Sequence, residues 1–276
     1  MTASNKTGCG SENVFDFFFE KKQIKTRDGA AIRWYHAVNS KEYLQKALKS
    51  AAHMLEADVL LGGQGSLTKE PVMAHSSSND SDCTLREWLD AVLKTDKGIK
   101  LDFKSLEVVE PSMNVLEKVK EHLQRPVWLN ADILMGPCGE SPTVAAQSFI
   151  DITTSYFPDA VLSLGWTTGW HPEKTKEVGY SWEMVKEMEH LCKPLKQPIT
   201  FPVRAALVFQ SKPQLQWLLK QSDSYSLTIW SGKEDQYCLE DLLNLRENLS
   251  KAQVFYDIFE PHLSRFLVAS GMQNSC

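Results

Sequence analysis

Eight short apolar runs that alternate with runs of helical spacing constrain the fold of this 276-residue chain more than any other feature. The predicted strands span residues 31–37, 54–61, 98–104, 127–134, 159–166, 203–209, 226–230 and 254–259. Alternation of strands and helices implies parallel pairing, and eight such units over about 250 residues are typical of a TIM (β/α)8 barrel. We therefore predict an α/β barrel. A doubly wound open sheet is the alternative, but no glycine-rich phosphate turn follows an early strand.

Local signals between these runs mark where helices begin. Ser40 precedes an amphipathic stripe, and Thr84 with Glu87 three residues later has the pattern of a capping box. Further helices are predicted after Pro111–Ser112, from Ser141–Pro142, from Ser181, from Ser211 and over residues 239–249.

The N-terminal segment differs from the rest of the chain. Residues 1–12 are polar and rich in Gly and Ser, whereas Val14–Phe19 is apolar and aromatic. We expect a loose tail and a possible barrel plug over residues 1–20, and a single barrel domain over residues 21–276.

The composition excludes several classes of protein. The net charge of −5 without a basic stretch argues against nucleic acid or an anionic membrane as the main partner. The six cysteines are scattered, which is typical of reduced structural thiols rather than a zinc site or a disulfide framework. Neither a signal peptide nor a membrane span is recognisable. We therefore expect an intracellular, cytoplasmic protein.

Polar side chains at the ends of four predicted strands indicate where the function lies, because barrel enzymes work at the carboxyl ends of their strands. The residues are His36 and Asn39, Glu56 and Asp58, Asp102 and Lys104, and Asn130 and Asp132. His75 lies in the long segment between Leu61 and Cys83. A loop of that length in a compact domain is usually functional, so we predict an active-site flap.

Three carboxylates from neighbouring strands, Glu56, Asp58 and Asp102, would repel one another. A hard divalent cation with oxygen ligands resolves the conflict, and Mg²⁺ or Ca²⁺ suits this set better than zinc. His36 and His75 could act as general acid and base beside the ion, and Lys104 would face a phosphate oxygen. Together these groups predict phosphodiester chemistry.

Each of these elements also has a structural interpretation. Asp102 with Lys104 could be an ion pair, Glu56 and Asp58 could form salt bridges with Lys100 or Lys104, and His36 could be a core histidine. Asn39, Asn130, Asp132, Trp166 and Trp230 are predicted to contact the substrate. For the two tryptophans, packing at the barrel mouth is the alternative role.

The order of His, ExD, a loop His and DxK resembles the phosphatidylinositol-specific phospholipase C-like phosphodiesterase superfamily, especially its glycerophosphodiester phosphodiesterases and sphingomyelinase D enzymes. The segments WYHAVNS, EADVLL, PVMAH, KLDFK, WLNADIL and LSLGWTT are more similar still to the menorin family, also called family with sequence similarity 151. The resemblance covers nearly the whole chain. It implies a barrel of the phospholipase C-like type, with Mg²⁺ or Ca²⁺ on Glu56, Asp58 and Asp102 and with His36 and His75 as the acid/base pair.

One departure bears on the substrate. The first strand ends in HAVN, where glycerophosphodiester phosphodiesterases have a His-Arg-Gly turn whose arginine would contact the phosphate. The sequence therefore predicts a metal-dependent phosphodiesterase acting on a small-molecule or lipid phosphodiester. The alternative is a non-catalytic binding or scaffold protein that keeps the barrel and a retained or degenerate metal site.

Overall fold

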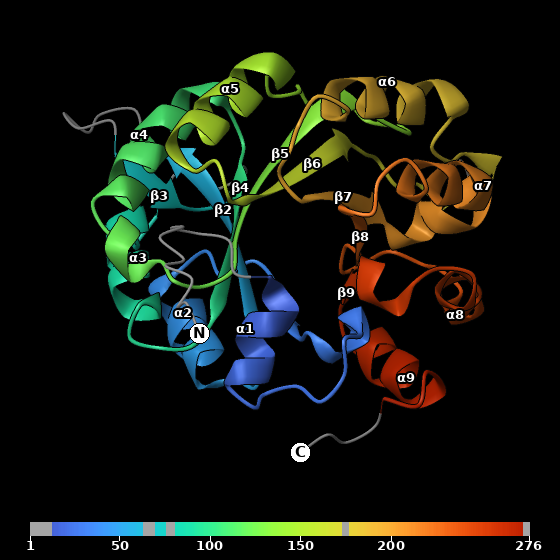
Figure 1. Cartoon of the computed structure of the whole chain (residues 1–276), viewed down its shortest axis with the longest axis horizontal. Helices are drawn as coiled ribbons and strands as arrows, with labels where there is room; N and C mark the ends of the chain where they lie inside the picture. The colour runs from blue at the N-terminus through green and yellow to red at the C-terminus, as the bar shows by residue number, and fades with distance from the viewer. Residues whose placement is uncertain (1–12, 63–69, 76–80, 173–176, 273–276) are drawn as a thin grey trace, which may run out of the picture.

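The computed structural model describes residues 13–62, 70–75, 81–172 and 177–272, and it has eight parallel strands arranged as a nearly closed barrel (Figure 1). In order around the barrel they are β1 (Trp34–Tyr35), β2 (Met54–Leu61), β4 (Gly98–Phe103), β5 (Val127–Met135), β6 (Val161–Thr167), β7 (Ile199–Arg204), β8 (Tyr225–Trp230) and β9 (Val254–Asp257). β3 (Pro71–Met73) adds to β2 in the antiparallel sense. The predicted α/β barrel is confirmed.

Helices surround this barrel on the outside (Figure 1). They are α2 (Lys41–Lys49), α3 (Leu85–Val92), α4 (Leu106–Glu117), α5 (Ala146–Tyr156), α6 (Trp182–Cys192), α7 (Val208–Leu219), α8 (Leu239–Glu247) and α9 (His262–Ala269). The capping box at Thr84 and Glu87 is present at the start of α3. No helix in the described ranges is long and apolar enough to cross a membrane.

Alternate residues of each strand face opposite sides, as the pleat requires. The side that faces the helices is apolar throughout, with Leu55, Ala57 and Val59 of β2 and Ile99, Leu101 and Phe103 of β4 fully or almost fully buried in one core cluster. The opposite side faces the barrel interior. It carries apolar residues where the strands begin and polar residues where they end.

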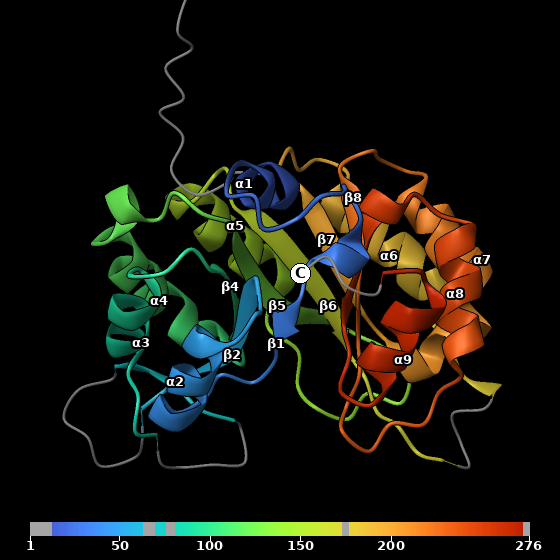
Figure 2. The ribbon, with the colours of Figure 1, turned by 90° about the horizontal axis from the view of Figure 1, so that it is seen from below.

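A second core cluster seals the barrel where the strands begin. α1 (Val14–Glu20) lies at this end of the strands (Figure 2) and contributes Val14, Phe15, Phe17 and Phe18. They pack with residues at the start of inward strand faces, namely Trp34, Met54, Trp128 and Phe255. The short helix η1 (Gly29–Ala31) packs against β9, where a Cβ on Gly29 would lie 1.9 Å from the Val254 carbonyl oxygen.

Several predicted boundaries are wrong. The sixth predicted strand, residues 203–209, is in fact β7 at Ile199–Arg204, because Pro202 is tolerated inside β7 and Phe209 already belongs to α7. α4 begins at Leu106 and α7 at Val208, each with a proline inside, Pro111 and Pro213. Burial of their apolar stripes outweighs the lost backbone hydrogen bond.

Two further boundaries differ from the prediction at the ends of elements. α5 begins at Ala146, five residues after Ser141, and the first strand has only two residues, Trp34 and Tyr35. Within the predicted flap, β3 and residues 74–75 are described, whereas residues 63–69 and 76–80 lie outside the described ranges.

Candidate active site

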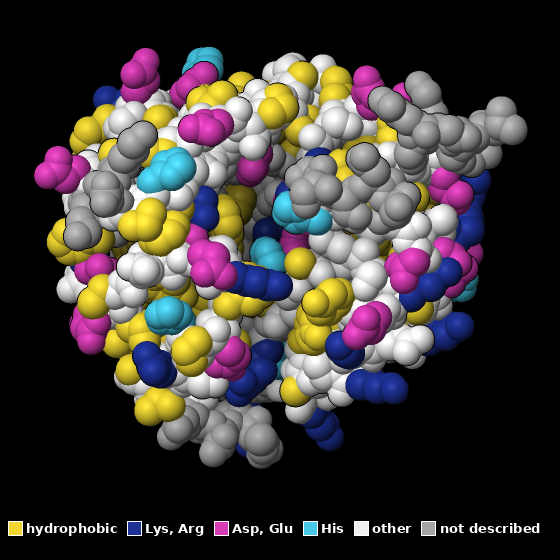
Figure 3. All heavy atoms as spheres, turned by 180° about the vertical axis from the view of Figure 1, so that it is seen from behind, with side chains coloured by type: hydrophobic (Ala, Val, Ile, Leu, Met, Phe, Trp, Pro, Cys, Tyr) yellow, Lys and Arg dark blue, Asp and Glu magenta, His cyan; other side chains and the backbone are white. Residues whose placement is uncertain are grey.

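The ends of β2, β4 and β5 bring inward-facing polar residues together at the barrel mouth. The parallel register places Asp58 beside Asp102, and Asp102 beside Asn130. Figure 3 views the face opposite α1 and shows a hollow that contains His, acidic and Lys or Arg side chains. The candidate site therefore lies at the end of the barrel that α1 does not cover.

Three carboxylates form the centre of this site. Glu56, Asp58 and Asp102 each offer one oxygen, and these oxygens all lie within 4.8 Å of one another. Glu56 is 2 % exposed and Asp58 is 6 % exposed, so both charges are largely removed from water. A compact set of oxygen donors of this kind fits a hard divalent cation.

Lys104 provides a positive charge within the acidic set. Its Nζ lies 2.7 Å from Asp58 Oδ1 and also contacts Asp102 Oδ2. Burial opposes the ammonium charge, but the carboxylates of Asp102 and Asp58 outweigh it and raise the pKa of Lys104 well above its usual value. Burial likewise opposes ionisation of Asp102, yet nearby Lys104 and Lys100 lower its pKa.

Negative charge nevertheless exceeds positive charge at the mouth. Burial, reinforced by Asp58, raises the pKa of Glu56 to about 7 even though His36 opposes the shift. Burial and the neighbouring Asp102 raise the pKa of Asp132 to about 7. Two carboxyl groups therefore titrate near neutral pH in this arrangement.

His36 follows β1 and is held by an acid from the other end of the chain. Its Nδ1 lies 2.7 Å from Asp257 Oδ2 and 3.5 Å from Glu56 Oε2. Burial lowers the affinity of His36 for a proton, but Asp257 and Glu56 together raise its pKa to about 9. The side chain remains 27 % exposed, with its ring edge against Phe259.

The HAVN turn after β1 positions the carboxylates. Ala37 has a φ of 56°, an uncommon conformation for a residue with a Cβ, and its N–H donates to Glu56 Oε2 at 2.8 Å. Asn39 Nδ2 donates to Asp58 Oδ2 at 2.7 Å, and the Asp58 N–H donates to Asn39 Oδ1 at 2.8 Å. Asn39 thus contacts a predicted metal ligand.

Asn130 has a similar position on the other side of the acidic set. Its Nδ2 donates to Asp102 Oδ1 at 2.6 Å, and its Oδ1 accepts from Ser163 Oγ at 2.5 Å. Asp132 lies next to Gly165, where a Cβ would come within 2.4 Å of Asp132 Oδ1. The structure therefore brings both Asn130 and Asp132 of β5 to the mouth.

His75 lies one residue beyond a direct contact with β2. The N–H of Ala74 donates to the Asp58 carbonyl oxygen at 3.3 Å, and His75 itself is exposed. This hydrogen bond places the segment that carries His75 beside the acidic set.

The two tryptophans lie in different places. Trp166 is 2 % exposed and packs against Tyr180 and Phe201 on the helix-facing side, so the structure does not bring it to the mouth. Trp166 follows Leu162 and Leu164 at a spacing of two residues along β6, which places all three on the helix-facing side. Trp230 ends β8 with the Arg204 guanidinium 5.1 Å from its ring.

Sequence reasoning missed three residues at this end of the barrel. Asp257 lies within the predicted strand 254–259, two residues after Phe255. Because alternate residues of a strand face the same side, this spacing could have shown that Asp257 faces inward. Arg204 ends β7 and forms two hydrogen bonds with the buried Asp235, at 2.7 and 2.6 Å. Because the sixth predicted strand was placed at residues 203–209, Arg204 was not recognised as the last residue of β7. Nothing in the sequence connects Arg204 with Asp235.

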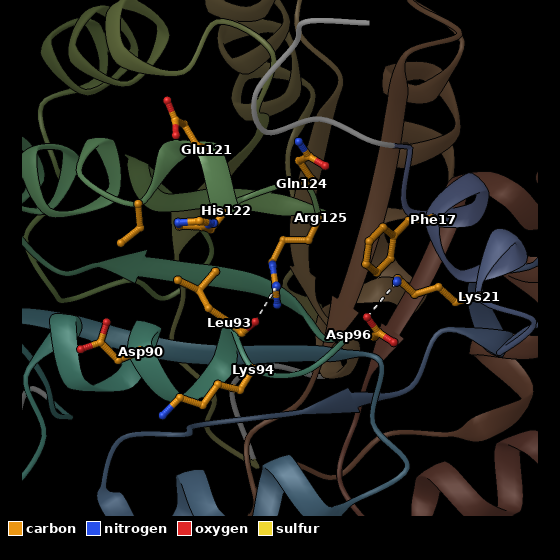
Figure 4. Close-up of a pocket in the computed structure, with 11 residues that line it drawn as sticks. Phe17, Lys21, Asp90, Leu93, Lys94, Asp96, Glu121, His122, Gln124 and Arg125 are labelled. Carbon is orange, nitrogen blue, oxygen red and sulfur yellow. Dashed lines mark hydrogen bonds and ion pairs between the residues drawn. The ribbon is translucent and has the colours of Figure 1, made fainter.

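A pocket of about 540 Å³ opens at the opposite, sealed end of the barrel (Figure 4). Two of the cations that line it have partners in the described chain. Lys21 pairs with Asp96 at 2.8 Å, and Arg125 donates to the carbonyl oxygens of Val92, Thr95 and Lys97. Among the described residues, the pocket also lacks a compact set of three carboxylates like the one at the mouth.

Comparison with known proteins supports the resemblance. The Menorin N-terminal domain model matches residues 28–263. The chain belongs to the menorin family. Protein FAM151B of Homo sapiens is 60 % identical over 266 residues, which cover 96 % of this menorin-family chain and 96 % of that protein.

A solved structure supports the fold of this menorin-family protein. The glycerophosphoryl diester phosphodiesterase from Parabacteroides distasonis has a TM-score of 0.53 and 13 % sequence identity, with 95 % of this chain and 94 % of that chain covered. At this identity the similarity establishes the barrel fold alone.

Proposed function

We propose that the protein is a metal-dependent phosphodiesterase that hydrolyses or cyclises a small-molecule or lipid phosphodiester. The observation that carries this proposal is the set of three carboxylate oxygens within 4.8 Å at the barrel mouth, beside His36. The fold shared with a glycerophosphoryl diester phosphodiesterase supports the same reaction class. The chemistry would be phospholipase D-like or glycerophosphodiesterase-like.

Glu56, Asp58 and Asp102 would hold the cation, with Mg²⁺ preferred and Ca²⁺ as the alternative. The acidic set supports this fit, because burial first and neighbouring carboxylates second raise the pKa values of Glu56 and Asp132, and a divalent ion would offset both effects on the charged forms. When bound, such an ion supplies positive charge that stabilises the phosphate oxygens in the transition state.

His36 is suited to act as the general acid. With a pKa of about 9 its imidazole carries a proton at neutral pH, and Asp257 holds Nδ1 so that Nε2 is left for the leaving alkoxide. His75 would then remove the proton from water or from a substrate hydroxyl. If a substrate hydroxyl attacks, a cyclic phosphate is the product.

The remaining predicted residues divide by their contacts. Asn39 and Asn130 hydrogen-bond to Asp58 and Asp102, so we assign them to positioning the carboxylates. Lys104 would contact a phosphate oxygen from its place between the same two carboxylates. Asp132 and Trp230 would line the substrate side of the mouth.

A non-catalytic binding or scaffold protein is the second candidate. The contact of Lys104 with both Asp58 and Asp102 favours it, because the chain partly neutralises its own acidic set. The HAVN turn, which lacks a phosphate-binding arginine, favours it as well.

Calorimetric titration with Mg²⁺ and turnover of a panel of glycerophosphodiesters and choline phospholipids distinguish the two candidates. The enzyme predicts Mg²⁺-dependent turnover that both His36→Ala and His75→Ala abolish, whereas the exposed His190→Ala leaves it unchanged. Full activity in both variants would refute the assignment of the histidines. Mg²⁺ binding without turnover of any phosphodiester would establish the scaffold.

A further inference from the structure

Lys100 is exceptional among the buried cations of the described chain. Four Lys or Arg residues are buried, namely Lys97, Lys100, Arg125 and Arg246. Lys97 donates to the carbonyl oxygens of Ser50 and Ala52, Arg125 donates to backbone carbonyls, and Arg246 pairs with Asp28. Within the described residues, Lys100 Nζ has neither a hydrogen bond nor an ion pair within 4.0 Å. Only 4 % of the residue is exposed to solvent.

The position of Lys100 directs its ammonium into the barrel beneath the acidic set. Lys100 lies two residues before Asp102 on the same face of β4 and is paired in register with Glu56. Its Nζ lies 5.9 Å from the ring centre of Trp34, another inward-facing residue. It is not one of the fully enclosed polar atoms without a partner, so it still reaches accessible space inside the barrel.

A buried ammonium without an acceptor is costly, and the nearby carboxylates do not supply one. Asp58 and Asp102 are instead engaged by Lys104. Alternate Cα atoms of a strand are about 6.6 Å apart, a span that the extended lysine side chain covers. An anionic oxygen held at the mouth beside Asp102 would therefore lie within reach of Lys100.

We infer that Lys100 forms the floor of the substrate site and binds a phosphoryl oxygen of the phosphodiester. This inference rests on the proposed function for the identity of the substrate. It gives the two lysines of KLDFK different positions at the anion, because Lys104 is bound by Asp58 and Asp102 whereas Lys100 lies deeper in the barrel without a carboxylate partner.

Equilibrium binding of two probes in saturating Mg²⁺ tests the inference. Dimethyl phosphate represents a phosphodiester and inorganic phosphate represents a free phosphate. We expect Lys100→Met to weaken dimethyl phosphate binding at least tenfold, whereas Lys94→Met, an exposed lysine near the sealed end, changes it less than twofold. Weaker binding of inorganic phosphate alone would overturn the phosphodiester assignment.

Mg²⁺ affinity separates an anion-binding role from a structural one. Removal of a positive charge near the carboxylates should leave Mg²⁺ binding unchanged or tighter in Lys100→Met. Unchanged dimethyl phosphate affinity in this variant, or no binding of either probe by the unsubstituted protein, would overturn the inference. Binding without turnover would refute the proposed enzyme but retain the anion site.

A measurement on the unsubstituted protein covers the case in which Lys100→Met does not fold. Tungstate soaked into crystals should place an oxygen within about 3.2 Å of Lys100 Nζ. An oxyanion bound at the mouth with Lys100 turned away from it would contradict the inference.

Discussion

The two ends of the barrel are built from the same strands and the same inward faces, but they have opposite chemistry. At the sealed end, Trp34, Met54, Trp128 and Phe255 pack beneath the aromatic residues of α1. At the mouth, the same strands present His36, Glu56 and Asp257. The difference shows how the molecule separates stability from function, because buried apolar area stabilises one end while the other holds mutually repelling charges.

The largest expected effect comes from the sealed end. Phe18 is fully buried, with its ring 5.0 Å from Phe17 and 4.9 Å from His53. Phe18→Ala should lower the free energy of unfolding by about 3–5 kcal/mol, because it leaves a cavity under the barrel. Urea denaturation measures this loss. The Mg²⁺ affinity of the folded variant should stay within about twofold of the unsubstituted protein, and a tenfold fall would show that the two ends are coupled.

The two ends should also respond to pH in opposite directions. Burial lowers the pKa of His53, at the sealed end, to about 4, and its Nδ1 accepts from the Arg33 N–H at 2.9 Å. The unfolded chain then binds more protons between pH 4 and 6.5, so this group makes stability rise with pH. Glu56 has its pKa raised to about 7, so the folded chain binds more protons, and stability falls as pH rises from 4.5 to 7.

Metal-free His53→Gln and Glu56→Gln test these slopes by chemical denaturation at several pH values. Relative to the unsubstituted protein, Glu56→Gln should gain stability from pH 4.5 to 7, whereas His53→Gln should lose stability from pH 4 to 6.5, each by roughly 3 kcal/mol. If the stability of both variants, relative to the unsubstituted protein, changed in the same direction as pH rises, the assigned pKa shifts of His53 and Glu56 would be contradicted.

A smaller effect is expected from a single carboxylate at the mouth. Asp102→Asn removes one anionic ligand but keeps the side-chain shape beside Asn130 and Lys104. Mg²⁺ affinity should fall at least about 30-fold, on the order of 2 kcal/mol. Metal-free stability should fall by about 1 kcal/mol, since Lys104 loses one carboxylate partner but keeps Asp58. Calorimetric titration of the variant and of the unsubstituted protein with Mg²⁺ measures the affinity. Unchanged affinity would exclude Asp102 as a ligand.

The smallest effect should come from Asn39→Ala. This change removes two hydrogen bonds to Asp58, which together contribute about 1–2 kcal/mol of stability. Because Asp58 then loses its orientation, Mg²⁺ affinity should fall about tenfold. A variant that loses stability but keeps full Mg²⁺ affinity would show that Asn39 serves the fold alone.

Part of the site followed directly from strand periodicity. A spacing of two residues places Glu56 with Asp58, and Asn130 with Asp132, on one face of a strand. The same rule, applied to Trp166 with Leu162 and Leu164, would have placed that tryptophan among the helices. The strand ends were harder to predict, because Pro202 within β7 and Pro111 within α4 break local rules that burial overrides.

The sequence by itself determined the alternation of strands and helices, the apolar plug and the common face of the acidic residues, since all of these depend on local periodicity. Only the tertiary structure decided that Asp257, 221 residues away, holds His36, and that Lys104 rather than Lys100 contacts the carboxylates. Closure of the barrel sets these contacts, because its register fixes which side chains from distant strands share one layer.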